Sequence, residues 1–312
     1  MAEELVTPQM LDDELLCSSD IDQFRVLKDL LAGTSGGIAQ VLVGQPFDTT
    51  KVRLQTATKT VSAINVVKDL LKYEGPLGFY KGTLTPLIGV GACVSVQFGV
   101  NEWMKRFFHN RDGNSAATSN RSKTLTLPQY YVCGLTGGVI NSFLSSPIEH
   151  VRIRLQIQTK SGSNAEFKGP LDCIKKLAAQ GQLMRGFPIM VLRAGHGLGV
   201  YFLVYEALIS SQIKKGFNRT ELETWKLCMY GAAAGTTLWI AVYPLDVIKS
   251  VVQSDNLRNP KYSTSIVKVA KALYAKEGMH AFFKGFVPTM LRATPANAAT
   301  FTAFEMAMRL MD

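Results

Sequence analysis

PFDTTKVRLQ at Pro46–Gln55 recurs as PIEHVRIRLQ at Pro147–Gln156 and as PLDVIKSVVQ at Pro244–Gln253. The copies begin 101 and 97 residues apart. In each copy an acid stands two residues after the proline, a base follows three residues later, and a glutamine closes the segment. Self-similarity at a nearly fixed period is the signature of a repeat architecture. We therefore predict that one structural unit occurs three times in this chain.

A glycine pattern precedes each motif at the same offset. Each motif proline lies thirteen residues after the first glycine of a GxxxG-type step, at Gly33, Gly134 and Gly231. Small residues four positions apart let two helix backbones approach closely, which is common in membranes. The pattern favours helices that pack within a bilayer.

Hydrophobic residues are concentrated in six moderately apolar stretches. Of the 312 residues, 47% are hydrophobic and 19% are charged. A hydrocarbon core of ~30 Å needs ~20 helical residues. Each stretch is long enough; they are 26–50, 83–108, 128–150, 187–212, 225–248 and 286–311. Most contain glycine, serine, threonine or proline, which suits a bundle around a polar cavity. We predict an all-α membrane protein with six transmembrane helices rather than a soluble helical-repeat protein.

Charge is distributed unevenly. The net charge is +10, yet residues 1–24 contain seven acids and no lysine or arginine, which leaves 34 bases against 17 acids in the rest. The sequence has no aromatic–basic cluster or nucleic-acid motif, so anionic lipid and anionic substrates are better partners than nucleic acid. The acidic leader resembles neither a transit peptide nor a signal peptide, so any organelle address is expected to be internal.

The five cysteines indicate neither a disulfide framework nor a metal site. They are odd in number and scattered, and we expect them to be small packing residues; they are Cys17, Cys93, Cys133, Cys173 and Cys228. The sequence also lacks a nucleophile–base set, a phosphate-binding loop and a metal-ligand cluster. We predict that the protein is not an enzyme and uses no metal or cofactor.

The sequence after each motif strengthens the repeat. An acid–glycine step is followed by an aromatic–base–glycine step at Glu74-Gly75…Tyr80-Lys81-Gly82 and at Glu277-Gly278…Phe283-Lys284-Gly285. The middle copy, Gln180-Gly181…Met184-Arg185-Gly186, is two residues shorter and lacks the acid and the aromatic residue. On these motifs, residues 25–311 resemble the mitochondrial carrier family (solute carrier 25). Within it they are similar to fungal amino-acid members of the carnitine/acylcarnitine–ornithine branch.

The resemblance implies a fold and a location. Each of three pseudo-symmetric repeats would have two transmembrane helices and a short amphipathic helix on the matrix side. The expected repeats are 25–111, 126–214 and 224–312, after an acidic extension at 1–24, and the short helices are expected at 60–73, 168–180 and 263–277. The resemblance further implies a monomeric, multi-pass protein of the mitochondrial inner membrane. Both termini would face the intermembrane space, and cardiolipin would bind at the matrix side.

The charges of the motifs predict a gate. An ionised side chain at membrane depth is costly unless it is paired or faces water. We expect each motif acid to end a helix and to reach the base of the next repeat. The resemblance implies a matrix gate braced by glutamines, with acids Asp48, Glu149 and Asp246, bases Lys51, Arg152 and Lys249, and braces Gln55, Gln156 and Gln253. The alternative is that the charges only anchor helix ends at the interface.

The opposite, cytoplasmic gate is expected to be weaker. The family pattern on the second, fourth and sixth transmembrane helices (the even helices) is aromatic–acid–x–x–base. Its acids in this sequence are Glu102, Glu206 and Glu305. Only Lys105 stands at the position of the base, because Arg309 is one residue late. One cytoplasmic pair against three matrix pairs predicts that the resting cavity opens to the cytoplasm.

Substrate is expected to bind between the gates. The resemblance places contact points thirteen residues before each even-helix acid; these and their neighbours are Gly89, Arg193, Ala194, Arg292, Gln97 and His196. Gly89 is neutral and is expected to leave space. The two guanidinium groups suit a carboxylate.

The contact residues also bear on which substrate is carried. In this branch the second contact arginine is commonly followed by an acid for a cationic substrate, but Ala194 stands there in this chain. Residues 83–101, 187–205 and 286–304 contain no acid, so the cation of ornithine, lysine or carnitine would lack a carboxylate partner on the even helices. Two arginines without an acid favour two negative groups. We therefore expect glutamate, followed by aspartate.

Three functions remain open at this stage. The first is an acidic amino-acid carrier that works by exchange (antiport) or by uniport with a proton. The second is a carrier of carnitine esters or basic amino acids, with the acid supplied elsewhere, for example by Asp29. The third is a proton-leak protein, against which the intact gates argue. His196 could carry a proton or could form a hydrogen bond with a neighbouring helix.

Overall fold

The computed structural model describes residues 23–57, 61–113, 125–159, 165–215, 224–257 and 265–311, together with Pro260 and Tyr262. Most of the acidic extension expected at 1–24 lies outside the described residues.

Six long helices follow one another in the predicted order. They are α1 (Gln23–Thr56), α3 (Leu84–Gly113), α4 (Leu127–Ile157), α6 (Phe187–Ile213), α7 (Thr224–Ser254) and α9 (Phe286–Met311). The described part of the chain contains no strand, and the all-α prediction is confirmed.

Two of the long helices, α6 and α7, are by themselves long and apolar enough to cross a membrane. A third span results when Pro76–Gly89 and Gly91–Phe108, which meet at a bend of 44° within α3, are taken as one span. Helices α1 and α4 carry more charged and amide side chains. Such helices require partner helices that cover their polar groups.

Each motif proline lies inside a long helix rather than at its end. Helices α1, α4 and α7 continue past Pro46, Pro147 and Pro244 and end only after the motif glutamine. The expectation that each motif acid ends a helix is therefore wrong. Proline removes one helical hydrogen bond and bends a helix, but the turns beyond it are held by ion pairs between neighbouring helices.

Three short helices lie where the sequence predicts them. They are α2 (Ala63–Tyr73), α5 (Pro170–Ala179) and α8 (Ile266–Glu277), and they begin two or three residues later than expected. The residues at the start of α2 and α5 explain where these two helices begin. The Ser62 hydroxyl accepts a hydrogen bond from the backbone N–H of Asn65, and Pro170 occupies the first turn of α5.

The link after each short helix has two glycines in the left-handed region in all three repeats. A glycine with φ between 64° and 71° follows the helix, and a second with φ between 79° and 82° precedes the next helix; these are Gly75, Gly181 and Gly278, then Gly82, Gly186 and Gly285. This left-handed region favours glycine. The glycines of the sequence pattern are therefore required by the turns, and the shortened middle copy keeps both.

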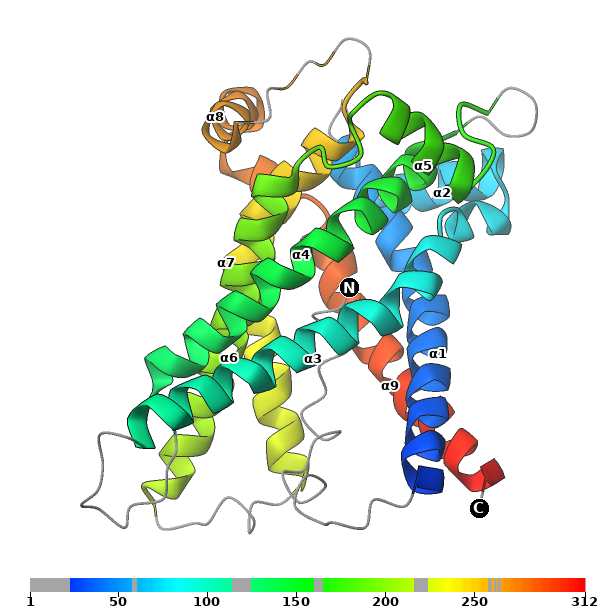
Figure 1. The fold of residues 1–312 in the computed structure, drawn as a ribbon. Helices are drawn as coiled ribbons and strands as arrows, with labels where there is room; N and C mark the ends of the chain where they lie inside the picture. Colours follow the sequence, from blue (N-terminus) through cyan, green and yellow to red (C-terminus); the bar gives the residue numbers. More distant parts are fainter. Residues whose placement is uncertain are drawn as a thin grey trace. The chain divides into compact units, whose positions relative to one another are not determined.

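The described residues form two compact units. Unit 1 comprises the described residues within 92–145 and 187–245, and it contains α6 with parts of α3, α4 and α7. Unit 2 comprises those within 23–91, 146–186 and 246–311, and it contains α1, α9, the short helices and the final turns of α4 and α7. In unit 2, α1 and α9 lie side by side (Figure 1).

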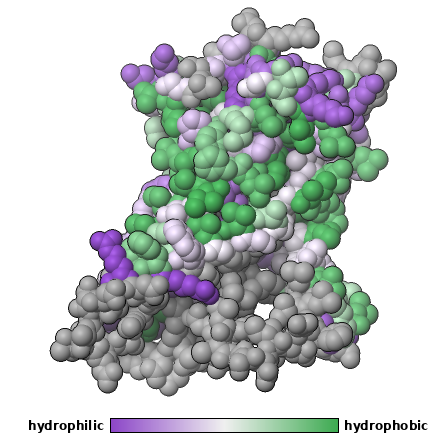
Figure 2. All heavy atoms as spheres, viewed as in Figure 1, coloured by the Kyte–Doolittle hydropathy of each residue, from purple (hydrophilic) through white to green (hydrophobic). Residues whose placement is uncertain are grey.

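Unit 2 has charged side chains inside and apolar side chains outside. Leu291 is 61% exposed, whereas the next residue, Arg292, is 3% exposed. Ile88 is 74% exposed, and Asp246 is 3% exposed. Figure 2 shows hydrophilic residues on the part of unit 2 where α2 and α5 lie. Charged groups are rarely buried in water-soluble proteins, so this distribution is the one expected of helices surrounded by lipid.

Candidate functional site

Six charged side chains meet in unit 2 just beyond the three motif prolines. They form the ion pairs Asp48–Arg152 at 2.7 Å, Asp246–Lys51 at 2.8 Å and Glu149–Lys249. Each acid contacts the base of the next repeat, and the base of repeat 1 closes the circle. The pairs therefore make a ring that joins α1, α4 and α7.

The position of these charges on their helices explains the ring. Acid and base lie three residues apart, so both point from the same face of each helix. Their side chains are between 4% and 17% exposed. Removing one partner of a buried ion pair leaves an uncompensated charge and is strongly destabilising. The ring can therefore hold three helix ends together, which separate anchors at an interface would not do.

The motif glutamines have different partners. The Gln55 amide donates to the Asp246 carboxylate at 3.0 Å, so it supports the Asp246–Lys51 pair directly. The Gln156 amide lies 3.4 Å from the Thr49 hydroxyl, and the Gln253 amide donates to a backbone carbonyl at 3.4 Å.

Arg292 of α9 reaches a carboxylate of the same ring. Its Nε is 3.4 Å from Oδ1 of Asp48, and its Nη1 is 3.5 Å from Oδ2. Gly44 of α1 provides the room, because a β-carbon there would lie 2.6 Å from Nη1 of Arg292. A search for acids on the second, fourth and sixth long helices alone misses this partner, because Asp48 lies on the first long helix, α1.

The space expected beside Gly89 is occupied. A β-carbon built on Gly89 would lie 2.6 Å from the end of the Ile148 side chain, which comes from the unit 2 part of α4. Gly89 thus allows Ile148 to pack closely against α3, and the expectation of open space there is wrong.

Other expected contact residues lie in unit 1. Arg193 and Ala194 are buried on α6, and the Arg193 guanidinium donates to the sulfur of Met190 at 3.4 Å. Nδ1 of His196 is 2.9 Å from the hydroxyl of Tyr131 on α4. This contact with a neighbouring helix is one of the two roles that the sequence allows for His196.

Gln97 of α3 and Asn141 of α4 form a buried amide pair in unit 1. Nδ2 of Asn141 donates to Oε1 of Gln97 at 3.2 Å, and the two residues are 4% and 2% exposed. Among the described residues, Nε2 of Gln97 and Oδ1 of Asn141 have no hydrogen-bond partner. Buried polar groups without partners are uncommon. The pair therefore offers one donor and one acceptor to a polar ligand.

A second set of ionic contacts lies outside the gate ring in repeat 1. The Arg53 guanidinium binds Glu74 at 2.5 and 2.9 Å, and Lys81 binds the same carboxylate at 2.6 Å. Arg53 also donates to the backbone carbonyl of Gln156 at 3.1 Å, which links repeat 1 to repeat 2. Burial by itself would raise the pKa of Glu74, but the hydrogen bonds from Arg53 and Lys81 outweigh burial, so the pKa lies below its ordinary value.

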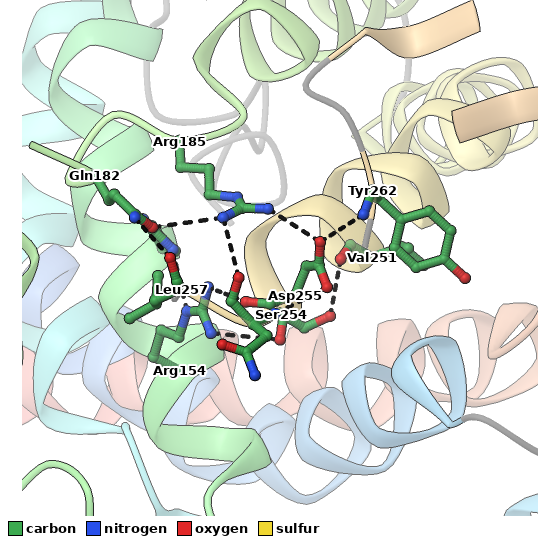
Figure 3. A network of polar contacts seen from close by, with 10 residues as sticks. Arg154, Gln182, Arg185, Val251, Ser254, Asp255, Leu257 and Tyr262 are labelled. Carbon is green, nitrogen blue, oxygen red and sulfur yellow. Dashed lines mark hydrogen bonds and ion pairs between the residues drawn. The ribbon is translucent and has the colours of Figure 1, made fainter. Parts of the chain in front are cut away.

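Repeat 2 lacks the equivalent acid at Gln180, and its base finds a partner in repeat 3 (Figure 3). Arg185 forms an ion pair with Asp255 at 3.1 Å. Arg154 donates to the backbone carbonyls of Ser254 and Asp255 at 3.4 and 2.6 Å, at the end of α7. The last carbonyls of a helix have no partner within the helix, so Arg154 satisfies groups that would otherwise remain without one.

The sequence contained a signal for these contacts. A second base follows the motif base by two positions at Arg53 and Arg154, and Val251 takes its place in the third copy. A base repeated at one offset indicates a shared role. The partner could not be read from the pattern, because Arg53 binds an acid of its own repeat and Arg154 does not.

The expected cytoplasmic gate is described only in part. The side chain of Glu102 lies outside the described residues, as does that of Asp29. Glu206 is buried on α6. Glu305 forms an ion pair with Arg309 one turn along α9, and both side chains are largely exposed. Arg309, one residue late for the family pattern, thus binds within its own helix.

Three of the cysteines are buried: Cys93, Cys133 and Cys173. Burial raises the pKa of Cys173 on α5 to about 12, so this thiol stays protonated at neutral pH. In the described ranges, no group of three or more histidine, cysteine, aspartate or glutamate side chains has the arrangement of a metal site.

Comparison with known proteins supports the repeat architecture. The family described as mitochondrial carrier protein matches residues 22–112, 123–216 and 220–312. The chain is 65% identical, over the full length of both proteins, to the mitochondrial glycine transporter YMC1 of Saccharomyces cerevisiae. It is 48% identical to the glutamate/glycine mitochondrial carrier ymc1 of Schizosaccharomyces pombe, over 89% of this chain and 92% of the relative.

A more distant relative is the mitochondrial basic amino acids transporter of Homo sapiens, which is 34% identical over 90% of this chain and 89% of the relative. The three matched blocks each contain one copy of the proline–acid–base–glutamine motif, and together they cover nearly the whole chain. The chain therefore belongs to the mitochondrial carrier family, and it is a transporter rather than an enzyme.

Proposed function

We propose that this protein carries a small α-amino acid across the mitochondrial inner membrane by alternating access, with glycine as the main substrate and glutamate as a second one. The observation that carries the proposal is the ring of three ion pairs that joins α1, α4 and α7. Such a ring closes one side of a bundle and can be broken and re-formed, because its members lie on separate helices. A transporter that alternates access needs a closure of this kind.

The amide pair of Gln97 and Asn141 supports recognition of an α-amino acid. A zwitterion needs a donor for its carboxylate and an acceptor for its ammonium group, and this pair keeps one of each available. Arg193, buried on α6, supplies a cation suited to the carboxylate that every amino acid has. These groups serve glycine and glutamate alike.

Two observations favour glycine over the glutamate that the sequence alone suggests. The relative with 65% identity is named a glycine transporter, and the one with 48% identity is named a glutamate/glycine carrier. The Arg292 guanidinium already has the Asp48 carboxylate beside it. The two contact arginines therefore do not require a substrate with two negative groups. Glutamate remains the second candidate because the relative with 48% identity is named a glutamate/glycine carrier.

The described conformation supports a gate that is closed on the matrix side. In this proposal the three repeats are 25–111, 126–214 and 224–312. Both termini face the intermembrane space, the carrier works as a monomer, and cardiolipin binds at the matrix side. The acids Glu102, Glu206 and Glu305, with Lys105, form the weaker gate on the opposite side. Transport by exchange fits two gates that open in turn.

Uptake of labelled solutes into liposomes that contain the purified protein tests the proposal. Glycine should enter, and Arg193→Ala should abolish uptake while the purified variant keeps its melting temperature within a few degrees. The outcome against the proposal is uptake of ornithine, lysine or acylcarnitine without uptake of glycine or glutamate. Proton flux without solute would instead indicate a leak protein.

A further inference from the structure

Two of the three helices that carry the motif are tied to the next repeat beyond the ion-pair ring. Arg53 of repeat 1 donates to the backbone carbonyl of Gln156 at 3.1 Å. Arg154 of repeat 2 donates to the backbone carbonyls of Ser254 and Asp255 at 3.4 and 2.6 Å (Figure 3). Each arginine stands seven residues after its motif proline, and each reaches the end of the next motif. We call these two contacts latches, and we call each meeting of two motif helices in unit 2 a joint.

The third copy of the motif cannot form a latch of this kind. Val251 stands where Arg53 and Arg154 stand in the other copies, and its side chain has no hydrogen-bond donor. It is buried in the final turns of α7. The ends of α7 and α1 are joined in the ring by the Asp246–Lys51 pair. This joint therefore has a ring contact but not the arginine contact that the other two joints add to it.

Repeat 3 nevertheless keeps the acid to which such a base would bind. In repeat 1, Glu74 binds Arg53 as well as a lysine of the following link. In repeat 3, Glu277 binds the equivalent lysine, Lys284, at 2.5 Å, and it also binds Lys276 at 3.1 Å. The side chain of Lys276 is 41% exposed. An acceptor for a base at position 251 is therefore already in place.

The latches make the three joints unequal. Each joint contains one ion pair of the ring, and a latch adds a hydrogen bond from a charged donor, which is stronger than one between neutral groups. The Gln55 amide does not replace a latch between repeats 3 and 1. It donates to Asp246, so it is lost together with the ion pair that it supports. A latched joint needs one more contact to break before its helix ends can separate.

We propose that the closed ring opens first at the joint between repeats 3 and 1, where Val251 replaces the latch arginine. The latches keep repeat 1 with repeat 2, and repeat 2 with repeat 3, while the ends of α7 and α1 separate. This inference rests on the proposed function, in which the ring is a gate that opens and closes. It makes position 251 a determinant of the transport rate and not of substrate choice.

The first test adds the third latch with Val251→Arg. The matched control is Val251→Leu, which enlarges the side chain without adding a donor. The measured quantities are the melting temperature of the purified protein and the initial rate of labelled glycine uptake into proteoliposomes. Val251→Arg should raise the melting temperature and lower the uptake rate about tenfold, because opening then breaks one more charged hydrogen bond. Val251→Leu should stay within about twofold of the wild-type rate, since it adds no polar contact.

A second test compares the three joints directly and does not depend on whether an arginine fits at position 251. The residue that follows each motif glutamine is Thr56, Ile157 or Ser254, and all three are half-buried. Cysteine pairs at two of these positions, joined by a short thiol cross-linker, close one joint at a time. The Thr56–Ser254 pair should abolish uptake, whereas the Thr56–Ile157 and Ile157–Ser254 pairs should retain most of it. Single-cysteine variants treated with the same reagent control for reaction at the native thiols.

The outcomes separate this inference from the proposed function. Wild-type protein that carries neither glycine nor glutamate contradicts the proposed function itself. If the wild type carries glycine, equal inhibition by the three cross-links overturns the inference, even when Val251→Arg cannot be purified. A stable Val251→Arg protein that transports at the wild-type rate also overturns it. Both of these results leave the carrier and its substrate in place.

Discussion

Arg185 of repeat 2 and Asp255 of repeat 3 form an ion pair in which Nη2 lies 3.1 Å from Oδ2 and each side chain is 7% exposed. In repeats 1 and 3 the base at the equivalent position binds an acid of its own repeat, as Lys81 binds Glu74. Repeat 2 has Gln180 where that acid would stand. The missing acid is therefore replaced by one from the next repeat, and the replacement ties the two repeats together.

Asp255→Ala should destabilise the protein by about 3 kcal/mol, because it leaves the buried Arg185 without its carboxylate. Restoring the acid of the repeat pattern with Gln180→Glu in the same variant should recover part of that loss. Melting temperatures of the purified variants in one detergent measure both effects. A double variant no more stable than Asp255→Ala alone would show that position 180 cannot supply the partner.

Gln55→Ala should weaken the matrix gate more than the same change at the other two motif glutamines. Gln55 donates to the Asp246 carboxylate, whereas Gln156 and Gln253 contact a hydroxyl and a backbone carbonyl at longer distance. A hydrogen bond to a charged group contributes about 1.5–3 kcal/mol. Melting temperature and initial uptake rate should both change most in Gln55→Ala. Equal effects in the three variants would contradict a special contact at Gln55.

The contacts of Glu74 predict a loss of stability in acid. Although burial opposes it, hydrogen bonding to Arg53 and Lys81 lowers the pKa of Glu74 in the folded protein. A carboxyl whose folded pKa is lowered stabilises the fold above its unfolded pKa and loses that contribution as the pH falls through the folded value. Glu74→Gln should lower the melting temperature at pH 7, and its effect should shrink as the pH falls through the lowered pKa of Glu74.

A matched control for this change is Glu305→Gln. Glu305 also has an arginine partner, but the two side chains are 64% and 76% exposed. Exposed ion pairs contribute about 0–1 kcal/mol, so the melting temperature of this variant should differ little from wild type at either pH. A Glu74→Gln effect that stays the same from neutral to acid pH would argue against the ionic explanation.

Gly138→Ala should destabilise the contact between α4 and α6. A β-carbon at position 138 would lie 2.3 Å from the backbone carbonyl oxygen of Ala194, and backbone cannot move aside as a side chain can. We expect a loss of about 2 kcal/mol or more. The control is Gly235→Ala on α7. Apart from the adjoining residues and its own helix backbone, no atom of the described residues lies within 4 Å of a β-carbon built there. Its melting temperature should stay the same or rise, since alanine favours a helix.

The glycine steps show which helix contacts the sequence pattern predicts and which it does not. In α4, Gly134 and Gly138 lie directly against the backbone of α6, as a GxxxG step predicts. In repeat 1 the close contact with α9 is made by Gly36, which lies between the two glycines of the step. In repeat 3, Gly235 has no such neighbour within the described part of the chain. The spacing identified helices that could pack closely, but the partner and the side of contact depend on how each helix is rotated.

The sequence by itself determined the threefold repeat, the helical class, the turns that require glycine and the residues that form the charged ring. These features are periodic or local, so spacing and residue type are enough to recognise them. Only the tertiary structure decided that Arg292 lies beside Asp48, 244 residues away, and that Arg185 binds Asp255, 70 residues away. Such contacts depend on which helix faces meet and on local space, such as that left by the missing β-carbon of Gly44. The order of charges along the chain specifies neither.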